Sequence, residues 1–266
     1  MEIAPFDKAD IEQLTALQED DWADMKLAFT DYLHLSFCYP IKVQIDGRVV
    51  GIGATIVHQD VGWLGHIVVD SAFRGKGLGK RITEHLVDIG GTHNCKTIYL
   101  LATDMGAPVY EKVGFITETE YLLFKDIKLK SEFDESAHIH PYREDFKRQI
   151  ARLDRTTSGE DRMFYIERFL ANGFVYLKDK VVEGYYLPDL GEGLLVAQTA
   201  SAGLELTKLH LKSHNRLMFP KNNLAVLDFL YRNGNKETEN CRRMRLGKER
   251  PVKMENIYNR IAGNVG

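Results

Sequence analysis

The chain has 266 residues, of which 44% are hydrophobic and 27% charged, and its formal net charge is −3. This length suits one large or two ordinary globular domains, and the small negative charge argues against a basic surface for nucleic acid or membranes. The cysteines Cys38, Cys95 and Cys241 are scattered and odd in number, which argues against a disulfide scaffold or a zinc ribbon. The start has no basic stretch followed by an apolar one, so a cytoplasmic protein without a membrane span is expected.

The first part of the chain predicts two helices followed by a hairpin. Apolar residues recur at helical spacing over residues 8–33, and the acidic residues 19–21 interrupt the pattern. Residues 41–45 and 49–57 then predict strands, and Asp46-Gly47 between them is a typical turn sequence for paired strands.

A glycine-rich segment between a strand and a helix is the most informative motif. The apolar residues 67–69 precede it, residues 74–80 are Arg-Gly-Lys-Gly-Leu-Gly-Lys, and apolar residues then recur at helical spacing. Glycines let backbone N–H groups approach an oxyanion, the positive end of the helix dipole faces it, and basic side chains suit phosphate. The segment has neither the Gly-Lys-Ser/Thr of a Walker loop nor the spacing of a dinucleotide site. It predicts a pyrophosphate cradle (residues 74–80), the alternative being a surface turn that caps the helix.

A second motif follows the cradle. Residues 97–102 predict an apolar strand, and a short helix ends in Tyr110-Glu111-Lys112-Val113-Gly114-Phe115. Together with Arg74-Gly75-Lys76-Gly77-Leu78-Gly79, this motif resembles the GNAT superfamily of acyl-CoA N-acyltransferases, which carries Arg/Gln-x-x-Gly-x-Gly/Ala at this point of its fold. The resemblance ends near Asp126. It implies a mixed, mainly antiparallel twisted sheet flanked by helices, an α/β (α+β) fold, with acetyl-CoA as co-substrate.

The resemblance also implies roles for individual residues. The backbone amides of the cradle would hold the CoA pyrophosphate, and the strand before it would pair with the pantetheine amides. Tyr110 lies where the family often places a hydroxyl near the CoA sulfur, and it would protonate the thiolate; the alternative is a core aromatic beside Phe115. Thr103 stands where the family often has a pantetheine-contacting Asn. The implied cofactor-binding residues are Ile67, Val68, Val69, Arg74, Gly75, Lys76, Gly77, Leu78, Gly79, Lys80, Thr103 and Tyr110.

The general base is left open by the sequence. An amine must lose a proton to attack a thioester, and a carboxylate or a histidine normally accepts that proton. His66 precedes the strand end 67–69 and is a weak candidate, beside a purely structural histidine; His34, Asp31 and Glu120 are weaker.

Three other groups of polar residues are candidates for binding a metal, a phosphate or the acceptor. His138-Ile139-His140 could chelate a metal, but no third ligand stands at recognisable spacing, so no metal is expected. Residues 242–245, Arg-Arg-Met-Arg, could meet a phosphate, although exposed strand charges are the favoured reading. Tyr185, Tyr186 and Arg243 are second-half side chains that could contact an acceptor.

The second half of the chain echoes the first. Residues 1–128 are expected to form the GNAT domain, 129–143 a polar linker, and 144–266 a degenerate GNAT-like domain of the tandem type. Helices near 144–171 and 200–212 and strands at 174–177, 181–187 and 193–197 are predicted. The slot that matches the cradle, residues 198–204, has one glycine and no basic residue, and Leu230 falls in the slot of Tyr110. One acyl-CoA site per chain is therefore expected.

The expected function is N-acetyl transfer from acetyl-CoA to a primary amine by direct attack in a ternary complex. A non-catalytic acyl-CoA-binding or sensing protein is the rival interpretation, and transfer of a longer acyl chain is a third. A small-molecule amine is the expected partner, with neither nucleic acid nor membrane, and a homodimer is one oligomeric state to test.

Overall fold

The computed structural model describes residues 1–18, 24–131 and 136–265, and the predicted break at residues 19–21 lies outside them. The chain divides into two compact units, and each is assembled from separate stretches of sequence. The two units are defined by the contacts within each of them and not by the sequence repeat. The domain limits expected from the sequence, at residues 128 and 143, therefore stay a prediction. The first unit comprises Met1–Thr117, Met244–Glu249 and Gly263–Val265, and the second comprises Glu118–Arg243 and Arg250–Ala262.

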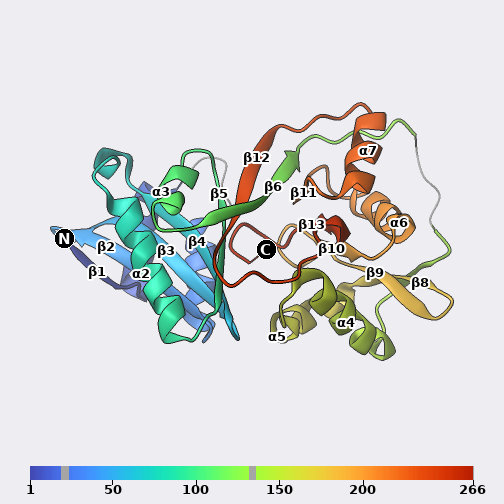
Figure 1. Cartoon of the computed structure of the whole chain (residues 1–266), viewed down its shortest axis with the longest axis horizontal. Coiled ribbons are helices and arrows are strands. Elements are labelled where there is room, and N and C mark those ends of the chain that lie inside the picture. Colours follow the sequence, from blue (N-terminus) through green and yellow to red (C-terminus); the bar gives the residue numbers. More distant parts are fainter. Residues whose placement is uncertain (19–23, 132–135, 266) are drawn as a thin grey trace. The chain divides into compact units, whose positions relative to one another are not determined.

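The first unit contains a twisted sheet in the order β1-β2-β3-β4-β5, next to which the end of β12 lies (Figure 1). β4 and β5 run parallel, whereas β1, β2, β3 and β4 pair antiparallel in succession. The predicted hairpin turn is confirmed: Asp46 and Gly47 have φ values of 50° and 78° between β2 and β3. The strands are β1 Glu2–Pro5, β2 Cys38–Ile45, β3 Arg48–His58, β4 Val61–Val69, β5 Thr97–Ala102 and β12 Glu239–Gly247.

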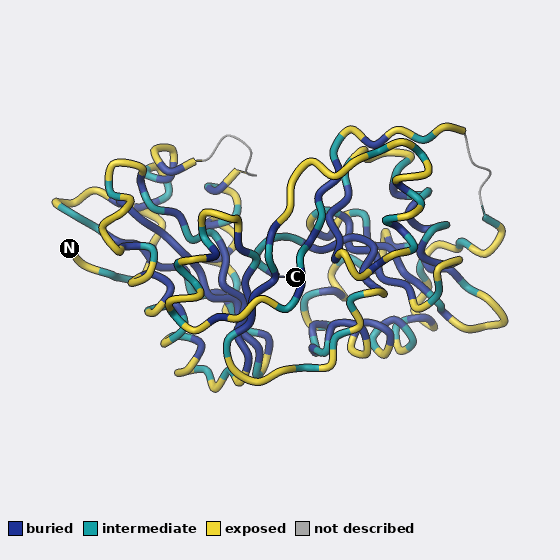
Figure 2. The backbone as a smooth tube through the Cα atoms, turned by 45° about the horizontal axis from the view of Figure 1, so that its top comes forward, coloured by how far each residue is buried: buried dark blue, intermediate teal, exposed yellow. Residues whose placement is uncertain are grey.

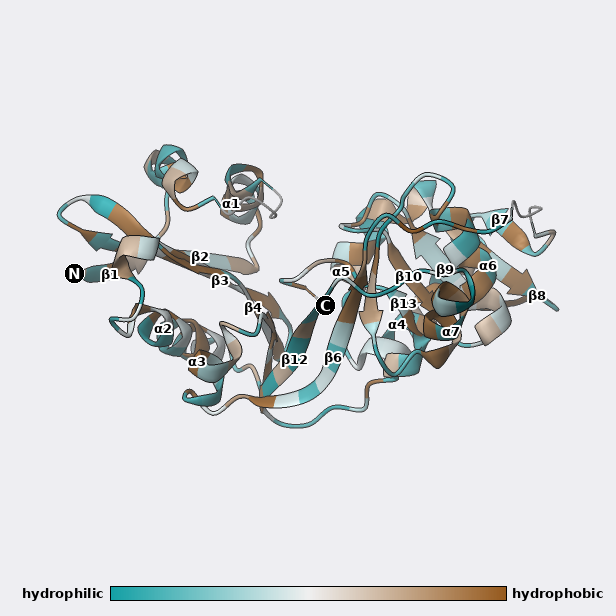
Figure 3. Ribbon diagram, turned by 90° about the horizontal axis from the view of Figure 1, so that it is seen from above, coloured by the Kyte–Doolittle hydropathy of each residue, from teal (hydrophilic) through white to brown (hydrophobic). Residues whose placement is uncertain are grey.

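The helix α2, Leu78–Thr92, packs on β3 and β4 of this sheet (Figure 1). Glycines on β3 permit the close approach: a Cβ atom at Gly51 would lie 2.9 Å from Ile82 Cδ1, and one at Gly53 would lie 2.8 Å from Leu86 Cδ1. Hydrophobic residues follow β3 and β4 (Figure 3), and the same strands are buried (Figure 2). The other helical segments are η1 Lys8–Ala16, α1 Met25–His34, η2 Ser71–Phe73 and α3 Ala107–Glu111.

The second unit contains an antiparallel sheet in the order β13-β10-β9-β8-β7, and β6 pairs antiparallel with β11. The predicted helices and strands of this half are confirmed within a few residues. The strands are β6 Ile116–Phe124, β7 Ile139–Pro141, β8 Phe174–Lys178, β9 Val181–Leu187, β10 Leu194–Ala197, β11 Leu217–Pro220 and β13 Ile257–Asn259. The helical segments are η3 Glu144–Phe146, α4 Lys147–Ser158, α5 Met163–Ile166, η4 Glu167–Asn172, α6 Ala200–His210, α7 Leu224–Arg232 and η5 Met254–Asn256.

The structure supports the internal repeat. The order strand, helix, strand, helix, strand is β4-α2-β5-α3-β6 in the first half and β10-α6-β11-α7-β12 in the second. In both halves a glycine lets the first of these helices approach its neighbours closely. A Cβ atom at Gly184 of β9 would lie 2.9 Å from Leu206 Cδ1 of α6, as at Gly51 under α2.

One expectation about the linker needs correction. The stretch predicted as an irregular linker contains β7, where Ile139 pairs with Tyr176. A strand at the edge of a sheet needs only backbone partners, so it forms without the alternating pattern that sequence reading depends on. Residues 132–135 of the predicted linker lie outside the described part of the chain.

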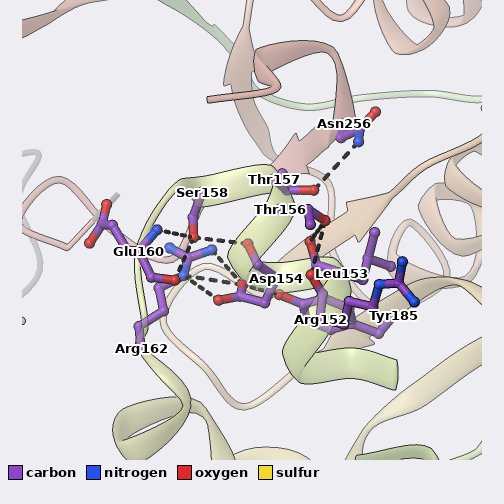
Figure 4. Close-up of polar contacts among 10 residues, drawn as sticks. All are labelled: Arg152, Leu153, Asp154, Thr156, Thr157, Ser158, Glu160, Arg162, Tyr185 and Asn256. Atoms are coloured by element: carbon purple, nitrogen blue, oxygen red, sulfur yellow. Dashed lines mark hydrogen bonds and ion pairs between the residues drawn. The ribbon is translucent and has the colours of Figure 1, made fainter. Parts of the chain in front are cut away.

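Buried charge is concentrated around Asp154 in the second unit (Figure 4). Arg162 Nε lies 3.1 Å from each carboxylate oxygen of Asp154, and Arg162 Nη2 lies 2.9 Å from Oδ1. The Tyr185 hydroxyl also donates to Asp154 Oδ1, so the pKa of Tyr185 is raised well above its usual value by burial and by this carboxylate. Tyr185 is thus a buried structural residue and not the acceptor contact that the sequence suggested.

The arginine cluster of β12 is the second correction. Arg243 and Arg245 are 2% and 9% exposed, although exposed charges were the favoured expectation. Arg243 Nε lies 3.2 Å from Glu118 Oε2, and the guanidinium of Arg245 donates to the Gly247 carbonyl. Burying an arginine is tolerated when its charge is paired, and here a carboxylate pairs with Arg243 and a carbonyl oxygen accepts from Arg245.

Candidate active site

The cradle joins η2 to α2, and its backbone conformation depends on glycine. Gly75 and Gly77 have φ values of 75° and 81°, in the left-handed region that side chains disfavour. A Cβ atom at either position would have no neighbour within 4 Å, so conformation and not crowding explains these glycines. Gly77 is the N-cap of α2 and makes no side-chain capping bond. The first N–H groups of a helix lack partners within it, so this end of α2 is suited to an anion.

The cradle carries three basic side chains, two of which donate to backbone carbonyls just before it. Arg74 Nε donates to the Val69 carbonyl at 3.0 Å, and Lys76 Nζ donates to the Ala72 carbonyl at 3.1 Å. Lys80 lies 3.3 Å from Glu84 one turn along α2. All three side chains are exposed, so their charge faces solvent at the helix start.

β4 contains a bulge against β3, and the bulge lies beyond the part of β4 that pairs with β5. The parallel β4–β5 pairing runs from Val61 opposite Thr97 to Leu64 opposite Leu100. The β3–β4 register shifts between Ile52 and Ala54. Residues 67–69 therefore continue towards the cradle beyond the paired part of β4 and β5. This is the segment that the sequence predicted to bind pantetheine.

Thr103 and Tyr110 meet around Gly106 at the start of α3. A Cβ atom at Gly106 would lie 2.9 Å from Tyr110 Cε2, 3.4 Å from its hydroxyl and 3.5 Å from Thr103 Oγ1. Thr103 Oγ1 accepts a hydrogen bond from the Gly106 N–H at 3.3 Å, so it stabilises the first turn of α3. Burial raises the pKa of Tyr110 to about 12, and its ring meets Phe115 edge-on at 6.3 Å. The start of α2 adjoins this helix, because a Cβ at Gly79 would lie 3.8 Å from Val109 Cγ1.

His66 lies in the β4 bulge with φ +51°. Its Nδ1 atom is 2.8 Å from the Tyr32 hydroxyl, and burial lowers its pKa to about 4, so the ring is neutral at pH 7. Asn264 Nδ2 donates to the same hydroxyl. Sequence reasoning missed Tyr32 and Asn264, because 232 positions separate them and neither belongs to a local motif.

The weaker base candidates lie elsewhere. Asp31 and His34 are exposed on α1, and Glu120 belongs to the second unit, where it pairs with Lys221 at 3.0 Å. His138 Nδ1 lies 3.2 Å from the Leu177 carbonyl. Among the described residues no group of three or more His, Cys, Asp or Glu could hold a metal ion. In the same described ranges, every helix is too short or too polar to cross a membrane.

Comparison with protein families matches the first unit. The model of the acetyltransferase (GNAT) family matches residues 6–115. A glucosamine 6-phosphate N-acetyltransferase of Trypanosoma brucei brucei is 33% identical over 86 residues, 30% of this chain and 56% of that protein. Glucosamine 6-phosphate N-acetyltransferase 1 of Dictyostelium discoideum is 31% identical over 127 residues, 43% of this chain and 81% of that protein. The chain thus spans only a little over half the length of the first of these two relatives.

Comparison with solved structures extends the likeness in fold to the whole chain. A structure from Pyrococcus horikoshii has a TM-score of 0.83 at 19% identity, over 100% of this chain and 95% of that chain. A tandem GNAT protein from the clavulanic acid biosynthesis pathway has a TM-score of 0.61 at 13% identity, over 92% of this chain and 98% of that chain. At these identities the likeness establishes the fold alone, and that fold has two similar halves.

Proposed function

The chain belongs to the GNAT acetyltransferase family, and we propose that its first unit transfers the acetyl group of acetyl-CoA to an amine. Acetyltransferases of this family use acetyl-CoA as co-substrate. The matched residues 6–115 all lie in the first unit, and so do the cradle and Tyr110. The second unit contributes no acetyl-CoA site in this proposal.

The open start of α2 is the observation that carries the proposal. The first N–H groups of α2 and the amides of Gly75 and Gly77 bind the pyrophosphate, where the helix dipole adds a favourable field. A phosphate replaces the capping side chain that this helix lacks. The exposed charges of Arg74, Lys76 and Lys80 add attraction that salt screens.

The pantetheine arm lies along Ile67, Val68 and Val69 as an added strand. The paired part of β4 and β5 stops at Leu64, which supports this position for an extended ligand. Thr103 and Tyr110 contribute hydroxyl groups from the loop after β5 and from α3.

The chemistry is a direct displacement. The amine nitrogen forms a bond to the acetyl carbon, the carbon–sulfur bond breaks, and the amine gives up a proton. Backbone N–H groups of β4 beyond the bulge polarise the acetyl carbonyl. Tyr110 protonates the departing thiolate and regains its proton from water. Its pKa of about 12 keeps the hydroxyl protonated at neutral pH, which is the state that a general acid requires.

The acceptor is a small-molecule amine, and glucosamine 6-phosphate is the first candidate because several of the relatives are named for it. Several of these relatives are matched over only part of their length, so this acceptor is a starting point for a wider panel.

The test is CoA release from acetyl-CoA with a panel of amines that contains glucosamine 6-phosphate, other amino sugars, polyamines and a lysine peptide. Amine-dependent release with matching acetylated product supports the proposal. Tight acetyl-CoA binding without release for any amine would overturn it in favour of the sensing role. A Gly77→Glu variant is the matched negative control for catalysis.

A further inference from the structure

The β4 bulge places His66 at the end of the proposed pantetheine segment that is farther from the cradle. Gly65 pairs with Ala54 and Val68 pairs with Ile52, so His66 and Ile67 together lie opposite one residue of β3. That is the pattern of a β-bulge, and bulges re-aim side chains beside active sites. Three residues at about 3.3 Å each separate His66 from the loop that leads to the cradle, so a ligand laid along them runs roughly 10 Å towards His66.

Three segments that are distant in sequence meet at this imidazole. Tyr32 of α1 places its hydroxyl 2.8 Å from His66 Nδ1, and Asn264 of the C-terminal segment donates to the same hydroxyl. The rings of Phe29 and Tyr32 contact the imidazole edge-on at 5.9 and 5.6 Å. All of these residues belong to the first unit.

Gly65 makes the position of Asn264 possible. A Cβ atom at Gly65 would lie 2.2 Å from Asn264 Cβ and 3.0 Å from its Cα, well inside any real contact. Asn264 therefore packs directly on the β4 backbone, next to the bulge. A larger residue at position 65 would displace Asn264 from Tyr32.

The donor and acceptor roles in the network follow from the amide. Asn264 Nδ2 can only donate, so the Tyr32 oxygen accepts from it, and the Tyr32 hydroxyl can donate its own proton to His66 Nδ1 when that nitrogen carries no proton. A neutral imidazole that accepts at Nδ1 carries its own proton on Nε2. The low pKa of His66, about 4 through burial, agrees with a neutral ring.

We propose that Tyr32 and His66 accept the proton of the attacking amine and that Asn264 is the positioning residue that orients this relay. The inference rests on the proposed N-acetyl transfer. As the nitrogen–carbon bond forms, the amine proton passes to the Tyr32 oxygen and the Tyr32 proton passes to His66 Nδ1. The imidazolium then returns its proton through Tyr32 to water. No other reactant is required.

The test uses the full chain with Asn264→Asp, which keeps the shape of the side chain but replaces the donor by an acceptor. The carboxylate draws the Tyr32 proton away from His66, so ¹⁵N NMR of the labelled imidazole should show that Nδ1 has lost its hydrogen bond. With glucosamine 6-phosphate, or the best amine of the panel, kcat should fall by roughly 10²-fold, in the range for loss of general base catalysis. The Kd for acetyl-CoA should not change.

Two further variants keep the result interpretable. Tyr32→Phe should lower kcat to a similar extent, and combining it with Asn264→Asp should add little, because both changes break one relay. Asn94→Asp makes the same chemical change at an exposed site of the first unit and should alter neither kcat nor the His66 signal. If the fold-losses of kcat in the two single variants multiply in the double variant, the two residues act independently and the relay is overturned.

The outcomes separate this inference from the proposed function. An unchanged His66 signal in Asn264→Asp overturns the positioning role, whether or not any amine is acetylated. A changed signal with an unchanged kcat overturns the proton relay. Wild-type protein that binds acetyl-CoA but acetylates no amine refutes the proposed function, and the NMR signal still tests the orientation of the ring.

Discussion

The helices α2 and α6 occupy the same place in the two halves of the repeat, but they begin in different ways. In α2 the N-cap is Gly77, which makes no side-chain capping bond. In α6 the N-cap is Thr199, whose Oγ1 accepts from the Ala202 N–H at 3.3 Å and donates to Glu183 at 2.9 Å. The first helix leaves its N–H groups for an anion, and the second satisfies one with its own threonine.

The helices that follow in the two halves, α3 and α7, also differ: one carries a proposed ligand-binding side chain and the other a core residue. Tyr110 of α3 brings a hydroxyl next to Thr103, whereas Leu230 of α7 is fully buried in the core of the second unit. The same order of elements therefore supports either a ligand site or internal packing. A few side chains decide which, so fold likeness alone cannot count the sites.

The largest expected effect is the loss of acetyl-CoA binding in Gly77→Glu. A carboxylate at the start of α2 repels the pyrophosphate, and a side chain also strains the left-handed backbone, so affinity should fall by about 10³-fold. Isothermal titration of the wild type should give one site per chain. Gly91→Glu, on the same helix with no neighbour within 4 Å of its Cβ, should bind normally. Two sites in the wild type would contradict the contrast between α2 and α6.

Tyr110→Phe should lower kcat by about 10²-fold with little change in acetyl-CoA affinity, because only the proton donor is removed. Steady-state kinetics with a saturating amine measures the effect. Tyr39→Phe removes another hydroxyl of the first unit and serves as the control. If Tyr110→Phe keeps the wild-type rate, Tyr110 has a packing role like that of Leu230.

Acid should destabilise the second unit through His210. Burial first, and then the His214 ring stacked at 4.5 Å, lower the pKa of His210 to about 4, while the Arg216 carbonyl opposes the shift. Between pH 6.5 and pH 4 the His210 side chain is protonated in the unfolded chain but not in the folded chain. The free energy of unfolding is therefore at its full value above pH 6.5 and decreases as the pH falls towards 4. The loss by pH 5 is about 2 kcal/mol. Urea unfolding at pH 7 and pH 5 tests this, and His210→Gln should reduce the difference; an equal difference would refute the assignment.

The smallest effects concern two helical glycines and have opposite signs. Gly91→Ala in α2 meets no atom within 4 Å and should stabilise by about 0.5–1 kcal/mol. Gly203→Ala in α6 would place a Cβ 2.0 Å from Tyr258 Cζ and should destabilise by about 1–3 kcal/mol. Urea unfolding at neutral pH measures both. If both substitutions increase the free energy of unfolding, the packing of α6 on Tyr258 is less tight than the structure indicates.

Local patterns in the sequence predicted most of the fold and the glycine-rich start of α2. The hairpin at Asp46-Gly47 and the glycine-rich start of α2 depend on neighbouring residues, so spacing was sufficient to find them. The burial of Arg243 depends on Glu118, which lies 125 positions away, and the sequence suggested exposure instead. The contact between Asn264 and Tyr32 is likewise invisible to any local window. Long-range pairing is what the sequence alone could not supply.

The three-part composition of the first unit has a consequence for biosynthesis. Met244 is fully buried in the core of this unit, and the Lys248 N–H donates to the Lys96 carbonyl at 2.8 Å. On a ribosome, the N-terminal part of a chain emerges first and usually folds first. Here the sheet of the first unit cannot acquire its β12 residues until residues 118–243, most of the second unit, have been translated. The unit proposed to bind acetyl-CoA is therefore begun before the second unit and completed after most of it.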